Sequence, residues 1–354
     1  NTTAHRSVAV GFEALKNSAV VGNSNASNVG VGYQAGTSLT SGISNVFVGA
    51  HSGDATTSGG QNTALGLGSL GANTTASNNT AVGYYALTAN TTGTRNTAVG
   101  ESALVSNTTG VYNSATGYRT LYYNTTADSN TGYGMQALYQ NTTGASNTAV
   151  GESALYNNTT AANNTAVGQA SLANNTTGAV NTALGTQSLA ANTTGVSNTG
   201  IGRSALLVNT TGIQNTAVGY NALAANTTAS NNSALGNGSL AANTTGAENT
   251  ALGAGAGERI TTGHDNICIG FVAGSHNVYL ATGTGNTIIG SYADVTDADV
   301  SYANVIGFDV SGGGGYTTLG YATNDIRAAH GNVTWATVSD QRYKKDIVDS
   351  TAGL

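Results

Sequence analysis

The chain has 354 residues and a net charge of −6, with 50 Gly, no Pro, one Cys and only 7% charged residues. Ordinary globular domains carry roughly 25% charged residues, so Asn, Thr, Ser and Gly must form most of this surface. That composition favours an extracellular rod over a soluble enzyme. The negative charge argues against a nucleic-acid partner. No apolar run approaches the roughly 18 residues of a membrane span, so we predict no membrane insertion.

Residues 1–27 form an irregular first segment, in which Gly11 and Gly22 end short apolar runs. The segment begins at Asn1 without an initiator Met or a signal peptide, which we interpret as the mark of a fragment or a processed product. Further along the chain, the single Cys268 excludes an internal disulfide framework.

Residues 28–270 repeat with a period of 17. The Gly that ends each N-T-A-V-G-like run recurs at 15 positions, from Gly32 to Gly270, without an insertion. The working consensus is N-T-A-V-G-x-x-A-L-x-x-N-T-T-G-x-x. A fixed period of this kind predicts a repeat architecture, in which each repeat is one structural unit.

The first half of each repeat alternates as a β-strand does. Thr and Val point to one face, and Asn and Ala point to the other. The pattern leaves open which face is interior. We nevertheless expect each repeat to bury about one Val and one Leu, and we expect the strand Thr to pack inward. The closing Gly allows a positive φ or a close approach of backbones where the strand turns.

The second half of the repeat contains N-T-T followed by Gly or Ala, which we interpret as an outer turn because Asn and Gly tolerate turn geometry. Seventeen residues are too few for a strand, a helix and two loops. We therefore predict an all-β fold, a parallel β-solenoid or β-roll in which each 17-residue rung has two short strands and two turns. The absence of Pro agrees, because interior rungs must donate their backbone N–H groups.

Residues 271–338 depart from the period and read as a terminal cap or knob. Candidate closing glycines fall at Gly290, Gly307 and Gly320, at steps of 20, 17 and 13. Aromatic residues of this segment are candidates for receptor contact, or alternatively fill the core of an oligomeric cap: Tyr279, Tyr292, Tyr302, Tyr316 and Trp335.

The cap also contains acidic residues without calcium-loop spacing, so we favour a solvated loop over a calcium site: Asp294, Asp297, Asp299 and Asp309. The five His residues are scattered along the chain without paired-ligand spacing. We therefore predict no metal site and no cofactor.

A rung that buries one Val and one Leu has little apolar burial with which to offset the entropy lost when the whole rung becomes ordered. Further apolar surface must then be covered by neighbouring rungs and by partner chains. We therefore expect a homotrimer.

The N-T-A-V-G-x-x-A-L repeat resembles the head repeats of trimeric autotransporter adhesins over roughly residues 7–310. The adhesin repeats have N-S-V-A-I-G-like motifs and form left-handed parallel β-rolls packed as trimers. The period differs, because the adhesin repeat is shorter, and the additional residues here correspond to the N-T-T-G turn. The resemblance implies a β-roll packed as a trimer.

Residues 339–347 read Ser-Asp-Gln-Arg-Tyr-Lys-Lys-Asp-Ile. This run resembles the start of the intramolecular chaperone that ends many phage tailspikes and tail fibres, with the pattern S-D-x-R-x-K-x-[DN]-I. Such chaperones trimerise the fibre and are released by self-cleavage beside the Ser. The resemblance implies that Ser339 is the nucleophile and Lys344 its partner, with Asp340 and Arg342 in positioning roles. Residues 339–354 would then be the truncated start of this domain.

Together these features favour an extracellular structural fibre, on a virion or a cell surface, that attaches to a host receptor such as a glycan or an outer-membrane component. A bacterial surface adhesin of the same repeat type is the alternative. An ice-binding face is disfavoured by the expectation that the strand Thr packs inward. A glycan-degrading tailspike needs paired carboxylates, and Glu101 and Glu152 lie three rungs apart, roughly 14 Å. We predict no enzyme activity apart from self-cleavage.

The eleven N-T-T triplets between residues 73 and 245 match the N-glycosylation pattern. The repeat itself accounts for them, so we do not expect them to carry sugar.

Overall fold

The computed structural model describes residues 6–18, 26–331 and 336–337. These residues form strands and turns and no helix, and therefore no helix long and apolar enough to span a membrane. The chain groups into two compact units, residues 1–221 with 225–228 and residues 222–224 with 229–354. Each unit is described by itself.

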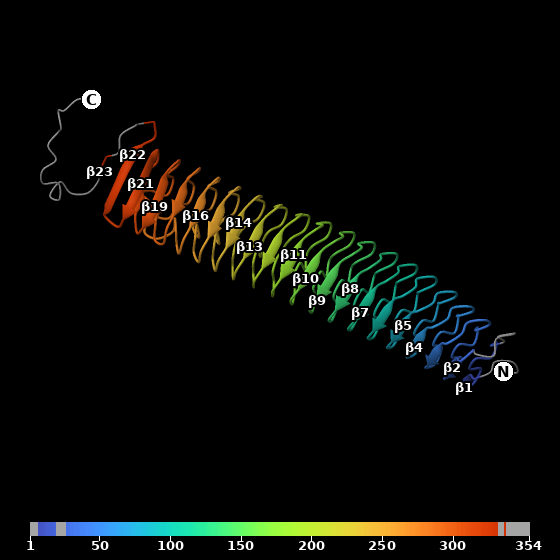
Figure 1. Cartoon of the computed structure of the whole chain (residues 1–354). Helices are drawn as coiled ribbons and strands as arrows, with labels where there is room; N and C mark the ends of the chain where they lie inside the picture. The colour runs from blue at the N-terminus through green and yellow to red at the C-terminus, as the bar shows by residue number, and fades with distance from the viewer. Residues whose placement is uncertain (1–5, 19–25, 332–335, 338–354) are drawn as a thin grey trace, which may run out of the picture. The chain divides into compact units, whose positions relative to one another are not determined.

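The first unit is a parallel β-solenoid with one three-residue strand in each described rung (Figure 1). Consecutive strands pair in parallel, and each residue pairs with its counterpart one repeat further on, as in Thr165↔Thr182. The first pair, Val8↔Val29, spans a longer rung. The strands are β1 (Val8–Val10), β2 (Val29–Val31), β3 (Val46–Val48), β4 (Thr63–Leu65), β5 (Thr80–Val82), β6 (Thr97–Val99), β7 (Ser114–Thr116), β8 (Thr131–Tyr133), β9 (Thr148–Val150), β10 (Thr165–Val167), β11 (Thr182–Leu184), β12 (Thr199–Ile201) and β13 (Thr216–Val218).

The second unit begins with rungs of the same kind, and its later rungs differ in length. Its rung length varies, as the parallel pairs show: Thr250↔Ile267, Ile267↔Thr287, Thr287↔Asn304 and Asn304↔Thr317. An antiparallel hairpin follows, in which Tyr321 pairs with Asn324. The strands are β14 (Ser233–Leu235), β15 (Thr250–Leu252), β16 (Ile267–Ile269), β17 (Thr287–Ile289), β18 (Asp294–Val295), β19 (Asn304–Phe308), β20 (Ser311–Gly312), β21 (Tyr316–Tyr321), β22 (Asn324–Ala329) and β23 (Ala336–Thr337).

The all-β solenoid with 17-residue rungs confirms the predicted fold class. The prediction of two strands per rung is wrong for the regular rungs; among the described rungs, those of β17 and β19 have a second strand, β18 and β20, and these two pair in parallel. After the closing Gly, the backbone alternates in the sign of φ: Tyr85 has a φ of 52° and Leu87 a φ of 53°. Extended strands need φ near −120°, so this half cannot form a second strand. Its N–H groups still bond to the next rung, as from Leu155 N to Ser171 O at 3.0 Å.

The interior holds the central residue of each strand from β2 to β17, most often Ala, and the Asn that precedes the strand, whereas the strand Thr and Val face outward. In β10 the central Ala166 is buried, Thr165 is exposed and Val167 is half-buried. The expectation that Val and the strand Thr pack inward is therefore wrong. The buried Leu of the following turn occupies the space beneath the strand. At Gly200, an added Cβ would lie 3.4 Å from Leu189 Cδ1 and 2.5 Å from Ser188 Oγ, so only small residues fit there.

The Leu of the repeat is the largest regular core residue and adopts an unusual backbone conformation. All eleven copies from Leu70 to Leu240 are fully buried, with φ between 49° and 54°. A left-handed backbone costs a non-glycine residue about 1–2 kcal/mol, which the burial of a Leu side chain, about 1.5–3 kcal/mol, offsets.

Both roles expected of the closing Gly, a positive φ and a close approach of backbones, are confirmed. Gly151 has a φ of 131°, and an added Cβ would lie 2.6 Å from the carbonyl oxygen of Gly168 in the next rung.

The Asn of N-T-T is buried, so its interpretation as part of an outer turn is wrong. Asn158 Nδ2 donates to Asn141 Oδ1 of the preceding rung at 2.8 Å and to the carbonyl of Ala161 at 3.0 Å. The same carbonyl accepts a hydrogen bond from Nδ2 of Asn147, the residue before β9, at 2.9 Å. Two Asn side chains thus meet on one carbonyl inside the rung and satisfy polar groups that burial would otherwise leave without partners. In the folded rung this amide nitrogen is buried and makes two hydrogen bonds; that these Asn residues carry no sugar stays a prediction.

Candidate functional site

The described residues form three surface features that are candidates for binding. We define the outer apolar column as the third residue of each strand from β1 to β17. It consists of Val, Leu or Ile except at Thr116 and Tyr133. Several members are strongly exposed, among them Leu65 at 47% and Leu184 at 46%. No charged residue occupies the first or third position of these strands, so an uncharged, largely apolar stripe runs along the strand face of each unit.

The second feature is a stack of tyrosines in the first unit. The rings of Tyr122, Tyr139 and Tyr156 stack in sequence at centroid distances of 5.3 and 5.0 Å. Arg119 lies 5.6 Å from the centre of the Tyr122 ring. Because the middle ring is covered on both faces by its neighbours, the stack presents edges and hydroxyl groups rather than open ring faces. It is better suited to joining rungs than to stacking on a ligand.

The third feature lies in the second unit, where four rings form what we call the distal aromatic column: Phe271, Tyr292, Phe308 and Tyr321. Tyr292 meets Phe271 and Phe308 edge-on at 5.4 and 5.6 Å, and Phe308 stacks on Tyr321 at 5.4 Å. The ring of His276 also packs on Tyr292, at 4.7 Å.

A loop beside this column is held by Asp294, which takes the position that Leu fills in regular rungs. Its Oδ2 accepts the backbone N–H groups of His276, Asn277 and Val278 at 3.2, 2.7 and 2.9 Å. Its Oδ1 accepts the N–H of Val295. Burial raises the pKa of Asp294, although these N–H donors act in the opposite direction. Asp294 is therefore a buried structural anchor, not part of the solvated loop that its acidic neighbours suggested.

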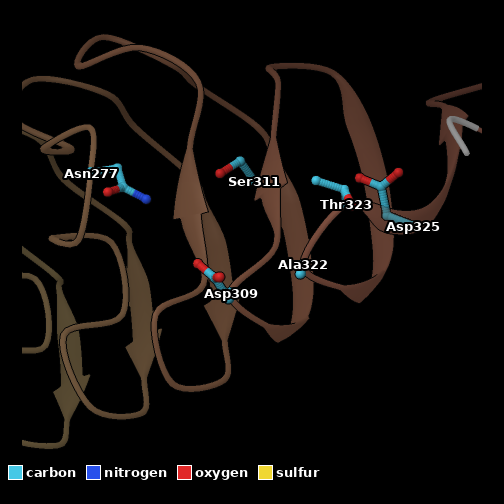
Figure 2. Close-up of a pocket in the computed structure, with 6 residues that line it drawn as sticks. All are labelled: Asn277, Asp309, Ser311, Ala322, Thr323 and Asp325. Atoms are coloured by element: carbon cyan, nitrogen blue, oxygen red, sulfur yellow. The ribbon is translucent and has the colours of Figure 1, made fainter.

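Next to this loop is a cavity of about 470 Å³, the distal pocket (Figure 2). Its lining comes from the 276–278 loop, the turn after β19, the start of β20, the turn between β21 and β22, and the start of β22. The lining residues are Asn277, Asp309, Ser311, Ala322, Thr323 and Asp325. Asp309 also lies 3.9 Å from His276, between its Oδ1 and the ring Nε2, which links the pocket to the distal aromatic column.

Of the predicted receptor-contact residues, the structure describes four. Tyr292 belongs to the distal aromatic column. Tyr279 is 48% exposed and lies under the guanidinium of Arg259 at 4.9 Å. Tyr302 and Tyr316 are exposed, and no ring contact joins any two of these four. Trp335 lies outside the described residues.

The residues of the predicted self-cleavage motif also lie outside the described part of the chain: Ser339, Asp340, Arg342 and Lys344. Their predicted roles stay predictions.

Sequence reasoning missed the distal pocket. Asp309 was noted only as a surface carboxylate, and Asn277, Ser311, Thr323 and Asp325 gave no signal. The uneven spacing of the closing glycines after Gly270 was the available clue, because a changed rung length alters which side chains of successive rungs meet. Within residues 6–18, 26–331 and 336–337, no group of three or more His, Cys, Asp or Glu side chains could hold a metal ion.

Comparison with known proteins adds no family to these observations: no family model, no curated protein and no solved structure matches the chain.

Proposed function

We propose that this chain is the rigid, repetitive part of an extracellular attachment fibre and that it works as a homotrimer. The observation that carries the proposal is the outer apolar column. A stripe of Val, Leu and Ile along the strand face is unfavourable in water, and contiguous exposed apolar surface commonly marks an interaction site.

Copies of the same chain are the best-matched cover for this stripe. Every copy presents the column at the same rung spacing, so rungs of neighbouring copies can pack in register along each unit. The first and third strand positions lack charge, so like copies would not repel each other there. Charged residues instead occupy the position after the closing Gly, as at Glu101, Glu152 and Arg203.

The mass of the intact protein in solution tests this proposal. We expect light scattering to give three chains per particle for the unaltered protein. The double variant Leu65→Asp and Leu184→Asp should give one chain per particle, because burying these carboxylates against partner chains is strongly unfavourable. Thr186→Asp, at an exposed position beside the column, is the matched control and should remain trimeric. A monomeric unaltered protein, or a trimeric double variant, would contradict the proposal.

The resemblance of residues 339–347 to the phage-fibre chaperone supports a phage-type fibre over a bacterial adhesin. On this proposal Ser339 cleaves the chain beside the motif, with Lys344 as its base. The full gene should yield a released C-terminal fragment on a denaturing gel, and Ser339→Ala should abolish that fragment. Identical products from both genes would leave the adhesin as the better interpretation.

Ice binding is a second candidate because the strand Thr faces outward, contrary to our expectation. Thr131, Thr165 and Thr182 are exposed, and neighbouring strands align these residues in register. The two functions compete for one face, since a trimer interface would cover it. Thermal hysteresis that is lost in Thr165→Tyr and Thr182→Tyr, in a protein of monomeric mass, would favour ice binding over the fibre.

A further inference from the structure

Five of the six residues that line the distal pocket are polar. Asp309 and Asp325 supply carboxylate oxygens, Asn277 an amide, and Ser311 and Thr323 hydroxyls, while Ala322 is the one apolar member. The carboxylates accept hydrogen bonds, and the amide and the hydroxyls can both donate and accept them. A pocket of this kind is suited to a ligand with many hydroxyl groups and poorly suited to an apolar one.

One oxygen in this lining lacks a partner. Asp325 Oδ1 is buried and accepts no hydrogen bond within the described part of the chain. A buried carboxylate oxygen without a donor is unfavourable, and it would gain a donor if the Asp325 side chain turned this oxygen toward a ligand hydroxyl in the pocket. Figure 2 shows Asp325 and Thr323 side by side on one wall, with Ser311 on the neighbouring rung and Asn277 beyond it.

The charge of the lining further restricts the class of ligand that the pocket can bind. It contains two carboxylates and no Lys or Arg. Such a lining repels carboxylate, sulfate and phosphate groups, because like charges disfavour each other most where water is partly excluded. The pocket therefore selects against anionic sugars.

A stacking surface lies close to the pocket. Tyr321 ends the distal aromatic column and is 62% exposed. Phe308 covers one face of its ring, and no further ring among the described residues covers the other. Each of these two rings is adjacent in sequence to a residue of the pocket lining: Phe308 precedes Asp309, and Tyr321 precedes Ala322. An open tyrosine face beside polar groups offers an apolar surface for the C–H face of a sugar ring.

We propose that the distal pocket binds a neutral saccharide, with Asp309, Asp325 and Asn277 bonding its hydroxyl groups and Tyr321 stacking on a ring. The inference names the receptor class for the proposed attachment fibre and rests on that function for its biological meaning. Binding at this pocket does not itself depend on the number of chains in the fibre.

The test uses the full chain on immobilised oligosaccharides: neutral hexose and N-acetylhexosamine chains, together with sialylated and sulfated counterparts. We expect binding to neutral members only. In calorimetric titration with the best neutral oligosaccharide, Asp309→Asn and Asp325→Asn should each weaken affinity about tenfold, which corresponds to one hydrogen bond to a charged group. Tyr321→Ala should have a similar effect. Asp299→Asn removes an exposed carboxylate of the same unit outside the lining and should bind as the unaltered protein does.

Three results would overturn the inference: no binding to any neutral oligosaccharide, binding confined to the sialylated or sulfated members, or an affinity of both pocket Asp variants equal to that of the unaltered protein. Release of new reducing ends, abolished by Asp309→Asn, would also overturn it by making the pocket hydrolytic. None of these results affects the trimer test, which depends on the outer apolar column. Unfolding midpoints of the variants, matched to that of the unaltered protein, ensure that a lost affinity reflects the pocket.

Discussion

At the scale of single residues, the repeat places ordinary side chains in unusual settings. Leu occupies the left-handed region in every regular rung, and Asn is a core residue. Both run against general preferences, since Leu rarely has a positive φ and Asn is mostly exposed. Each is stabilised by its neighbours: Leu by burial, and Asn by hydrogen bonds to equivalent residues one rung away.

Cys268 follows the general preference and gives a clear prediction. It is the central residue of β16, is fully buried, and its pKa is raised to about 12 by burial. Because the thiolate is the reactive form, the native thiol should react with a disulfide reagent at pH 8 more than about a hundredfold more slowly than the unfolded thiol.

The measurement compares thiol release in buffer and in guanidinium chloride, where one thiol per chain should react. A native rate close to the unfolded rate would mean that the rungs around β16 open readily.

At the scale of the rung, one three-residue strand and a long turn are held together by side chains as much as by the sheet. The carbonyl of Ala161 receives both Asn147 and Asn158 from inside its rung. Asn147 Oδ1 also accepts the backbone N–H of Asn164 in the next rung, at 3.0 Å. The Asn ladders therefore brace each rung internally and join it to the next.

Replacing Asn147 should therefore be costly. Asn147→Leu removes the acceptor for the Asn164 N–H and one of the two donors to the Ala161 carbonyl. The Asn164 N–H is left without a partner, which costs about 1–3 kcal/mol, and the lost hydrogen bond to the Ala161 carbonyl, which keeps Asn158 as a donor, costs about 0.5–1.5 kcal/mol. We therefore expect a loss of about 2–4 kcal/mol in the free energy of unfolding, measured by urea denaturation.

The exposed Thr160 in the same rung provides the control. Thr160→Ala should change stability by less than about 0.5 kcal/mol. If Asn147→Leu behaves like Thr160→Ala, the ladder is not a source of stability.

At the scale of the whole chain, charge contributes little. The sequence has 10 basic and 16 acidic residues in 354, and ion pairs in the described residues, such as Lys16 with Glu13, are partly or largely exposed. Exposed pairs contribute about 0–1 kcal/mol and weaken with salt. Stability should come instead from stacked rungs, each of which contacts its neighbours.

The chain should consequently be insensitive to ionic strength. Between 0.05 and 1 M NaCl, we expect the free energy of unfolding to change by less than about 1 kcal/mol. Sodium sulfate is the informative comparison, because it should stabilise the chain by strengthening apolar burial. A loss of several kcal/mol in NaCl would show that charge pairs hold the rungs together after all.

The sequence by itself determined the period, the closing Gly and the all-β solenoid, because a solenoid repeats the same local geometry and so must repeat its residues. The spacing of Gly290, Gly307 and Gly320 also predicts the altered rung lengths after Gly270. These properties are local to one rung, and 15 aligned copies make each of them visible within a single chain.

Only the tertiary structure decided which strand face is interior, because alternation defines two faces without ranking them. Hydropathy favoured Val over Asn as the interior residue. In the structure, however, the Leu of the turn lies beneath the strand and leaves room only for a small residue such as Ala. Buried carbonyls such as that of Ala161 also require the Asn amides as hydrogen-bond donors. The left-handed backbone conformation of the Leu, which the sequence did not reveal, likewise prevents the second strand that we predicted for each regular rung. The distal pocket depends on Asn277, Asp309 and Asp325 meeting across successive rungs, and nothing in their local sequence specifies that meeting.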